Sequence, residues 1–142
     1  MTIATELLQQ HLQLLVDDNP AWQTLIHDDI VWDLPYAPSL GHPLQLDGKD
    51  AVLRHTGWFV DAVTDFRFFD TEVVATDDPQ RAVARVQAEG LVAATGRHYQ
   101  QEYVVFLTAR DGRIARLREY FDPVKAALAF DAPIVGVPSR SI

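Results

Sequence analysis

The second half of the sequence is a run of β-strands, and this run constrains the fold more than any other feature of the chain. From residue 65 the side chains alternate with the period of strands, and clear turns lie at Asp77-Asp78-Pro79-Gln80 and Asp111-Gly112. Strands joined by short turns form hairpins, so we expect an antiparallel sheet. Its four strands are expected at residues 65–76, 81–94, 98–110 and 113–121.

Most of the helices are expected before this run of strands. Leu8, Leu12 and Leu15 recur at helical spacing and predict an amphipathic first helix. Asn19 and Pro20 suit the cap and the first position of a second, short helix. Beyond it the pattern predicts a strand at 29–36, a polar loop at 39–46, a helix at about 49–63 capped by Asp47, a final helix at 123–130 and a proline-containing tail at 131–142.

The order of these elements predicts an α+β fold in which helices cover one face of an antiparallel sheet. A chain of 142 residues can bury a sizeable core, and no linker or shift in composition divides it. No internal repeat is evident either. Residues 1–142 are therefore expected to form a single domain.

Composition excludes several classes of function. The 12 Lys and Arg residues against 20 Asp and Glu residues give a formal net charge of −8, and there is no basic run, so neither nucleic acid nor an anionic membrane is an expected partner. The chain has no cysteine, which excludes thiolate metal sites and cysteine nucleophiles. Without a leader-like N-terminus or an apolar stretch of membrane-spanning length, a cytoplasmic protein is expected.

Neither a metal site nor a nucleotide cofactor is expected from the remaining motifs. His27-Asp28-Asp29 are successive residues on one extended segment, and such residues cannot converge on a single metal ion. The seven glycines form no phosphate-binding loop, nucleophile elbow or dinucleotide fingerprint.

Glu119 is the most informative candidate for chemistry. Alternation along the last strand places its carboxylate on the more apolar face, where loss of solvation raises the pKa toward the range of a general base. The alternative is a strand-end glutamate that forms an ion pair with an arginine. The two expected faces are Ala115, Leu117, Glu119 and Phe121 on one side, and Ile114, Arg116, Arg118 and Tyr120 on the other.

His55 falls on the apolar stripe of the third helix with Val52, Phe59 and Ala62. An imidazole in that position can exchange protons across a cavity with Glu119. A lone histidine on such a stripe is more often a core residue that is hydrogen-bonded to the backbone, and this is the alternative.

Polar and aromatic side chains complete the set of candidates. Tyr99 and Gln101 share one face of the strand at 98–110, where a hydroxyl or amide can hydrogen-bond a developing oxyanion. His98 replaces Tyr99 if the register differs by one residue. Aromatic side chains are abundant enough to line a pocket for an apolar or cyclic ligand. The substrate-binding candidates are Trp32, Asp33, Tyr36, Trp58, Phe59, Gln101 and Phe121.

The order of elements and several stretches of sequence resemble the nuclear transport factor 2-like superfamily, a cone-shaped α+β fold that also houses ketosteroid isomerases and SnoaL-like polyketide cyclases. Residues 97–106, 110–114 and 118–123 are similar to the final hairpin of the SnoaL-like branch. Gly48-Lys49-Asp50 leading to His55 and Trp58, the turn at 76–79 and the tail at 132–138 resemble the phenazine-biosynthesis A/B proteins of that branch.

The resemblance implies a curved sheet around a conical cavity, a homodimer built on the sheet, and acid/base chemistry without a metal or organic cofactor. In the phenazine proteins a helix histidine and a last-strand glutamate act on the substrate, and these match His55 and Glu119. Ketosteroid isomerases keep their base near the end of the first strand, so the resemblance to them makes Asp33 a competing base. Four residues after the histidine those proteins carry a hydroxyl side chain, whereas this chain has Phe59. That departure weakens the expectation of a phenazine substrate.

Three functions are consistent with these residues. The leading hypothesis is a cofactor-independent isomerase, cyclase or condensation-type enzyme acting on a small cyclic carbonyl compound, with Glu119, His55 and Tyr99 as catalytic residues. The second is a non-catalytic module for small-molecule binding or dimerisation, in which Glu119 is paired, for example with Arg97. The third, an epoxide hydrolase, requires Asp33, Arg85 and Asp65 to meet.

Overall fold

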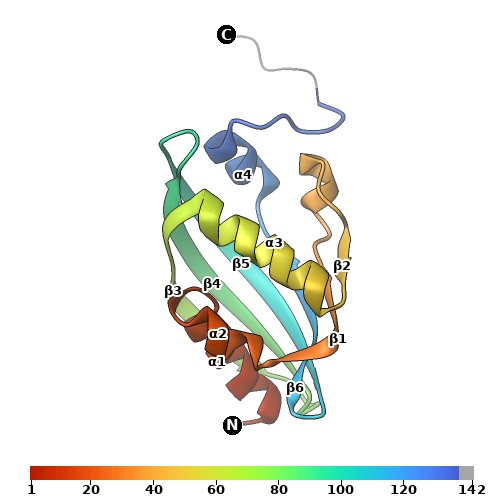
Figure 1. The fold of residues 1–142 in the computed structure, drawn as a ribbon. Helices are drawn as coiled ribbons and strands as arrows, with labels where there is room; N and C mark the ends of the chain where they lie inside the picture. Colours follow the sequence, from red (N-terminus) through yellow and green to blue (C-terminus); the bar gives the residue numbers. More distant parts are fainter. Residues whose placement is uncertain (138–142) are drawn as a thin grey trace.

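Six strands form one open, curved sheet, and the helices lie across one of its faces (Figure 1). The structure is a computed structural model that describes residues 1–137. The predicted α+β class and the covered concave face are confirmed. The elements are α1 (Ile3–Asp17), α2 (Asn19–Gln23), β1 (Ile26–Asp33), the 3₁₀ helix η1 (Ala37–Leu40), β2 (Gln45–Asp47), α3 (Lys49–Ala62), β3 (Val63–Ala75), β4 (Arg81–Val92), β5 (Arg97–Arg110), β6 (Arg113–Tyr120) and α4 (Pro123–Phe130).

The strand order is β2-β1-β6-β5-β4-β3, with neighbouring strands hydrogen-bonded. The four strands from β3 to β6 pair in antiparallel fashion, as the turns between them predict. The sheet is nevertheless not purely antiparallel, because β1 pairs parallel to β6. No turn links those two strands in sequence, so turn chemistry could not indicate their relative direction.

The region between residues 26 and 47 differs most from the sequence prediction. The first strand begins and ends three residues earlier than expected, at Ile26–Asp33. The predicted loop at 39–46 contains the end of η1 and the start of the short strand β2, which pairs with β1. β2 has only three residues, too few to show a period of two in the sequence.

The predicted helix caps were wrong by one residue in both cases. Asp18, not Asn19, caps α2, since its Oδ1 accepts a hydrogen bond from the backbone N–H of Ala21 at 3.3 Å. Gly48, not Asp47, is the N-cap of α3, with a φ of 87° that favours glycine. Asp47 is instead the last residue of β2.

The tail predicted at residues 131–142 is described as far as residue 137, and 138–142 lie outside the described residues. Its first part packs back onto the fold. The backbone N–H of Val135 donates to the carbonyl of Ser39 in η1 at 2.8 Å. The tail therefore runs beside η1, at the end of the cone where α4 also lies (Figure 1).

A buried histidine joins α1 to α2 beneath the sheet. The indole N–H of Trp22 donates to Nδ1 of His11 at 2.9 Å, and both side chains are almost fully buried. Burial lowers the pKa of His11 to about 4, which keeps the imidazole neutral and able to accept this bond. The pair satisfies two polar groups inside an apolar core.

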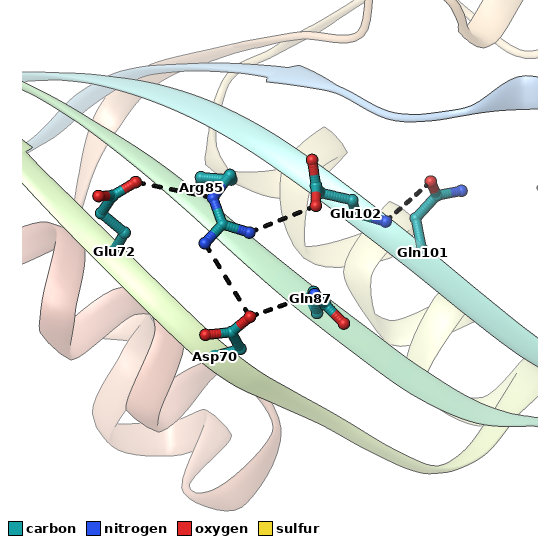
Figure 2. Close-up of polar contacts among 6 residues, drawn as sticks. All are labelled: Asp70, Glu72, Arg85, Gln87, Gln101 and Glu102. Atoms are coloured by element: carbon teal, nitrogen blue, oxygen red, sulfur yellow. Dashed lines mark hydrogen bonds and ion pairs between the residues drawn. The ribbon is translucent and has the colours of Figure 1, made fainter.

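The outer face of the sheet carries a polar cluster centred on Arg85 of β4 (Figure 2). Its guanidinium lies 3.3 Å from Glu102, 3.6 Å from Glu72 and 4.0 Å from Asp70. Gln87 also donates to Asp70 at 3.2 Å. The cluster ties β3, β4 and β5 together on the face opposite the helices.

Two bulges bend β3, and a glycine in β4 makes room for the first. The β3–β4 register shifts between Thr64 and Arg67 and again between Phe69 and Glu72, and each shift contains an aspartate with positive φ, Asp65 and Asp70. Opposite the first bulge lies Gly90. A Cβ there would be 2.5 Å from Cγ1 of Val63 and 3.1 Å from the carbonyl oxygen of Thr64. The curvature of the sheet therefore depends on a missing side chain.

Gly90→Ala is expected to destabilise the protein by about 1–3 kcal/mol, because the added methyl group overlaps Val63 and the bulge backbone. Gly57→Ala is the matched control. Gly57 lies on the exposed side of α3, and a methyl group added to it would meet nothing within 4 Å, so alanine there should stabilise the helix by up to about 1 kcal/mol. Urea denaturation measures both, and equal effects of the two substitutions would contradict this view of the bulge.

Candidate active site

A cavity of about 250 Å³ lies between the inner face of the sheet and the helices α3, η1 and α4. Its wall is largely apolar, with a few polar groups from different elements. The lining residues are Leu34, Ala37, Leu40, His42, His55, Trp58, Phe59, Tyr99, Tyr103, Glu119, Phe121, Ala126, Phe130 and Ala132. Such a mixture of apolar walls and few convergent polar groups is typical of small-molecule sites.

Glu119 lies on the cavity wall, on the inner face of β6 opposite Val105 of β5. Among residues 1–137 no group donates a hydrogen bond to its carboxylate. Burial raises the pKa of Glu119 to about 8. A carboxyl group with this pKa exists in both protonation states near neutral pH, as acid/base catalysis requires.

The two faces of β6 match the prediction from Arg116 onward but not before it. Arg116 and Arg118 lie on the outer face, as expected. Ile114 was expected to accompany them, yet it is fully buried and pairs with Ile26 of β1. The reason is a bulge in which Ala115 is the extra residue, since Ala109 pairs with Ile114 and Thr108 with Arg116.

His55 projects from α3 onto the wall of the same cavity as Glu119. Burial lowers its pKa, and the neighbouring imidazole of His42 lowers it further. The two histidine rings lie 6.5 Å apart between centroids, and His42 also lines the cavity. Sequence reasoning missed His42, which precedes β2 in a segment that looked like a polar loop.

Two tyrosines on β5 provide hydroxyl groups. The hydroxyl oxygens of Tyr99 and Tyr103 are 2.8 Å apart, and both residues line the cavity. Burial raises the pKa of Tyr99 to about 12 and that of Tyr103 well above its usual range, so both keep their protons. One proton makes the bond between them, which leaves the other hydroxyl proton free to bind a ligand.

The register of β5 agrees with the choice of Tyr99 over His98, because His98 is exposed on the outer face. Tyr103 lies four residues after Tyr99 in β5, so strand alternation places both side chains on the inner face. This spacing is the sequence signal that could have identified Tyr103. Sequence reasoning did not include it among the site residues.

Gln101 lies between the two tyrosines in sequence but does not line the cavity. Its amide oxygen accepts from the backbone N–H of Asp122 at 2.9 Å, and its Nε2 donates to the carbonyl of Asp122 at 3.0 Å and to the Tyr99 hydroxyl at 3.2 Å. Asp122 in turn caps α4 by accepting from Val124 and Lys125. Gln101 therefore fixes the helix that supplies Ala126 and Phe130 to the wall.

The aromatic candidates divide into two groups. Trp58, Phe59 and Phe121 line the cavity, and Trp58 stacks on Phe130 while remaining 44% exposed. Tyr36 is outside it, 47% exposed, with its ring against Tyr120. Trp32 is also outside it, in the wall of a second and smaller cavity.

Asp33 lies away from the cavity, in an ion pair. Its carboxylate accepts from Arg116 at 2.8 and 3.1 Å and from Gln45 at 2.7 Å, and Arg118 lies 3.7 Å away. Burial acts to raise the pKa of Asp33, but the hydrogen bonds and the arginine charges outweigh it and lower the pKa. Asp33 is therefore ionised and fully engaged.

The residues of an epoxide-hydrolase cluster do not meet. Asp33 binds Arg116, Arg85 binds three other carboxylates on the outer face, and Asp65 is exposed at the bulge of β3. Within residues 1–137 no three His, Asp or Glu side chains are placed to hold a metal ion. In the same part of the chain no helix is long and apolar enough to cross a membrane.

Comparison with known proteins finds one protein family and similar solved structures. The family model described as SnoaL-like domain matches residues 9–117. The uncharacterized PhzA/B-like protein PA3332 of Pseudomonas aeruginosa is 31% identical over 86% of this chain and 86% of its own length. A Bacillus subtilis protein proposed to be an isomerase has a TM-score of 0.80 and 30% identity, covering 91% of this chain and 93% of its own.

A second solved structure agrees in fold. A protein from Xanthomonas campestris pv. campestris, proposed to be a polyketide cyclase, has a TM-score of 0.77 at 22% identity, covering 90% of this chain and 96% of its own. The likeness extends over nearly all of the chain. The nuclear transport factor 2-like, ketosteroid isomerase-like fold inferred from the sequence is therefore confirmed.

The free energy of unfolding is expected to fall as the pH rises from about 6.5 to 8. Folding raises the pKa of Glu119 from 4.5 to about 8, so in this window the folded state binds more protons than the unfolded state. Below pH 6.5 His11 and His55, whose pKa values fall on folding, give the opposite slope. Glu119 contributes at most about 1.4 kcal/mol per pH unit.

Chemical denaturation at both ends of the window measures this slope for the wild type and for Glu119→Gln. Glutamine does not titrate, so its variant should lose the part of the slope due to residue 119. Identical slopes for the two proteins would show that the carboxyl group ionises as readily in the fold as outside it.

Proposed function

Because the chain belongs to the SnoaL-like domain family, we propose that it is a cofactor-independent acid/base enzyme acting on a small cyclic carbonyl compound. The observation that carries this proposal is the environment of Glu119. Its carboxyl group has no hydrogen-bond partner within residues 1–137, has a pKa near 8, and shares one cavity with His55 and two tyrosine hydroxyls. A carboxyl group that only forms a structural ion pair would have a charged partner and a lowered pKa, and Glu119 has neither within residues 1–137.

In the proposed reaction the ionised Glu119 removes a proton from the carbon next to the carbonyl group. The electron pair of that C–H bond moves into an enolate, whose oxygen is stabilised by a hydrogen bond from the free tyrosine hydroxyl or from His55. Where the substrate has a double bond β,γ to the carbonyl, the enolate is a conjugated dienolate, and return of the proton from Glu119 to its γ carbon completes an isomerisation. Attack of the enolate carbon on a second carbonyl of the same molecule would instead close a ring, and the alkoxide formed would take the proton held by Glu119.

The cavity favours a ring-shaped, mostly apolar substrate. Phe59 places its ring edge-on to Phe66 at 4.9 Å and toward Tyr99 at 6.0 Å, which makes this part of the wall aromatic. The phenazine proteins are expected to have a hydroxyl group at the corresponding position. We therefore propose a cyclic ketone or polyketide-like compound in preference to a phenazine precursor.

The contacts of Arg97 bear on the alternative of a non-catalytic binding module. That hypothesis expected an ion pair between Arg97 and Glu119. Arg97 instead donates to the carbonyl of Leu128 at 2.7 Å and lies 3.5 Å from Asp131. With its pKa raised and not lowered, Glu119 fits the role of a base better than that of a structural ion.

Glu119→Gln is expected to lower activity by about 10²–10⁴-fold, because the amide cannot accept the substrate proton. The assay uses a panel of cyclic β,γ-unsaturated ketones, with the absorbance of the conjugated product and deuterium uptake from D₂O as readouts. Glu102→Gln is the matched control, since Glu102 lies on the outer face beside Arg85. Unchanged deuterium uptake in Glu119→Gln would remove Glu119 from the mechanism.

We further propose a homodimer formed through the outer face of the sheet. This face carries large apolar side chains that are exposed or half-buried around the Arg85 cluster. Phe106 is 38% exposed at its centre, with Tyr120 of β6 against its ring. The apolar set comprises Phe69, Val74, Val83, Leu91, Val104, Phe106 and Tyr120.

Phe106→Asp is expected to weaken the dimer by at least about tenfold, since it places a charge in the apolar part of the interface. Sedimentation velocity over a range of concentrations measures the change. Leu44→Asp is the control, because Leu44 is 58% exposed in the loop before β2, away from this face. A wild-type chain that remains monomeric, or equal weakening by both variants, would refute this interface.

A further inference from the structure

A second cavity of about 50 Å³ lies behind Glu119, on the side of α3 that faces α1. It shares His55, Phe59, Tyr103 and Glu119 with the main cavity, so these four side chains border both spaces. The rest of its wall is mostly apolar. The other lining residues are Leu15, Val16, Trp32, Thr56, Val60, Phe66 and Phe68.

Trp32, one of the residues of this wall, has a buried hydrogen-bond donor. The residue is 3% exposed, and its Nε1 has no acceptor among residues 1–137. A buried donor without a partner costs about 1–3 kcal/mol, so such groups are normally satisfied by protein or by water. The contrast with Trp22, whose Nε1 binds His11, shows that this core does satisfy a buried indole where an acceptor is near.

Two of the residues that line this smaller cavity, Thr56 and Glu119, carry hydrogen-bond acceptors. The hydroxyl of Thr56 donates to the carbonyl of Val52 at 3.0 Å, which leaves its oxygen lone pairs free to accept. The carboxylate of Glu119 also accepts, and it has no protein partner within the described residues. One donor and two acceptors are the number of partners that a buried water molecule usually has.

The size of the cavity also selects the occupant. A water molecule occupies about 30 Å³ of liquid volume, so 50 Å³ holds one or two waters but no cyclic compound. Glu119 is the only lining side chain that can offer a negative charge to a small cation, and burial favours its neutral form, so a cation would be poorly compensated there. Water is the ligand whose size and hydrogen-bonding capacity both fit.

We propose that this inner cavity is a water-binding site in which a water molecule accepts a hydrogen bond from Trp32 and donates to Glu119 and Thr56. The water holds the carboxylate from behind and leaves its other oxygen directed to the main cavity. Trp32 is then a positioning residue, since it acts on Glu119 through the water. The effect on catalysis rests on the proposed function, whereas the water site itself does not.

The test removes the N–H group of Trp32 and keeps the shape of the ring. Replacement of Trp32 by the analogue 3-benzothienylalanine does this, and Trp32→Phe is the genetically encoded counterpart. Trp22→Phe is the matched control, because it also removes a buried indole donor but one that binds His11. The wild type and all three variants are followed by NMR of the indole protons and of the Glu119 carboxyl carbon.

The wild type should show magnetisation transfer between a long-lived water molecule and the Trp32 indole proton. In both position-32 variants the pKa of Glu119 should rise by about half a unit to one unit, because the ionised form loses a polarised hydrogen bond. His55, Tyr99 and Tyr103 also face Glu119, and their titrations must be followed to exclude them as the cause. Trp22→Phe should leave the Glu119 titration unchanged.

Absence of the water signal at Trp32 would overturn the proposal, as would a Glu119 titration that is the same in the wild type and in the 3-benzothienylalanine variant. Failure of the water site can be distinguished from failure of the proposed enzyme mechanism. If Glu119→Gln keeps full activity while the water is observed, the enzyme mechanism fails and the water site remains. If Glu119→Gln is inactive and the inner cavity is dry, only this inference fails.

Discussion

The bulge at Ala115 is the feature on which the candidate site depends. The two-residue turn Asp111-Gly112 has positive φ at both positions, 56° and 73°, and pairs Arg110 with Arg113 on the outer face. Without an extra residue, the period of two would carry every odd-numbered side chain of β6 to the outer face, including residue 119. The bulge shifts this parity and turns Glu119 inward while Arg116 and Arg118 remain outside.

This partition of charge explains the unusual properties of the inner groups. Arg116 and Arg118 of β6 form ion pairs with Asp33 of the neighbouring strand β1 and are therefore not available to Glu119. With desolvation alone acting on it, Glu119 is held mostly protonated at neutral pH, and desolvation also favours the neutral form of His55. An apolar cavity can contain both groups because neither carries a permanent charge. The proposed proton transfer to and from a substrate depends on the same condition.

The sequence predicted the parts of the fold that have their own periodicity or turn chemistry. The four strands of the hairpin run, α1, α3 and α4 were all found near their expected positions, and Tyr99 was correctly placed on the inner face of β5. Glu119 was placed on the covered side, although the simple alternation used for it failed at Ile114. A bulge adds one residue without a distinctive sequence signal, so its effect on parity was not visible.

The features that the sequence did not reveal depend on contacts between distant segments. The parallel pairing of β1 with β6 brings Asp33 beside Arg116, 83 positions later, and this contact explains the burial of a carboxylate that its neighbours did not predict. His42 reaches the cavity because η1 and β2 turn the chain back over it. Trp32 of β1 was predicted to bind the substrate, but it lies in the wall of the smaller cavity and not in that of the main one.

Asp33 and Glu119 are two carboxyl groups of one sheet whose pKa values are shifted in opposite directions. The two carboxyl groups lie on neighbouring strands, that of Asp33 in a buried residue and that of Glu119 in a half-buried residue on the cavity wall. Hydrogen bonds and positive charge stabilise the ionised form of Asp33, whereas desolvation disfavours the ionised form of Glu119. Because the arginines stabilise the ionised form of Asp33, protonation of this carboxylate is unfavourable near neutral pH. Asp33 is therefore unsuited to the role of the proposed base. Of the two, only Glu119 is placed to gain from proton uptake and to contact a ligand in the cavity.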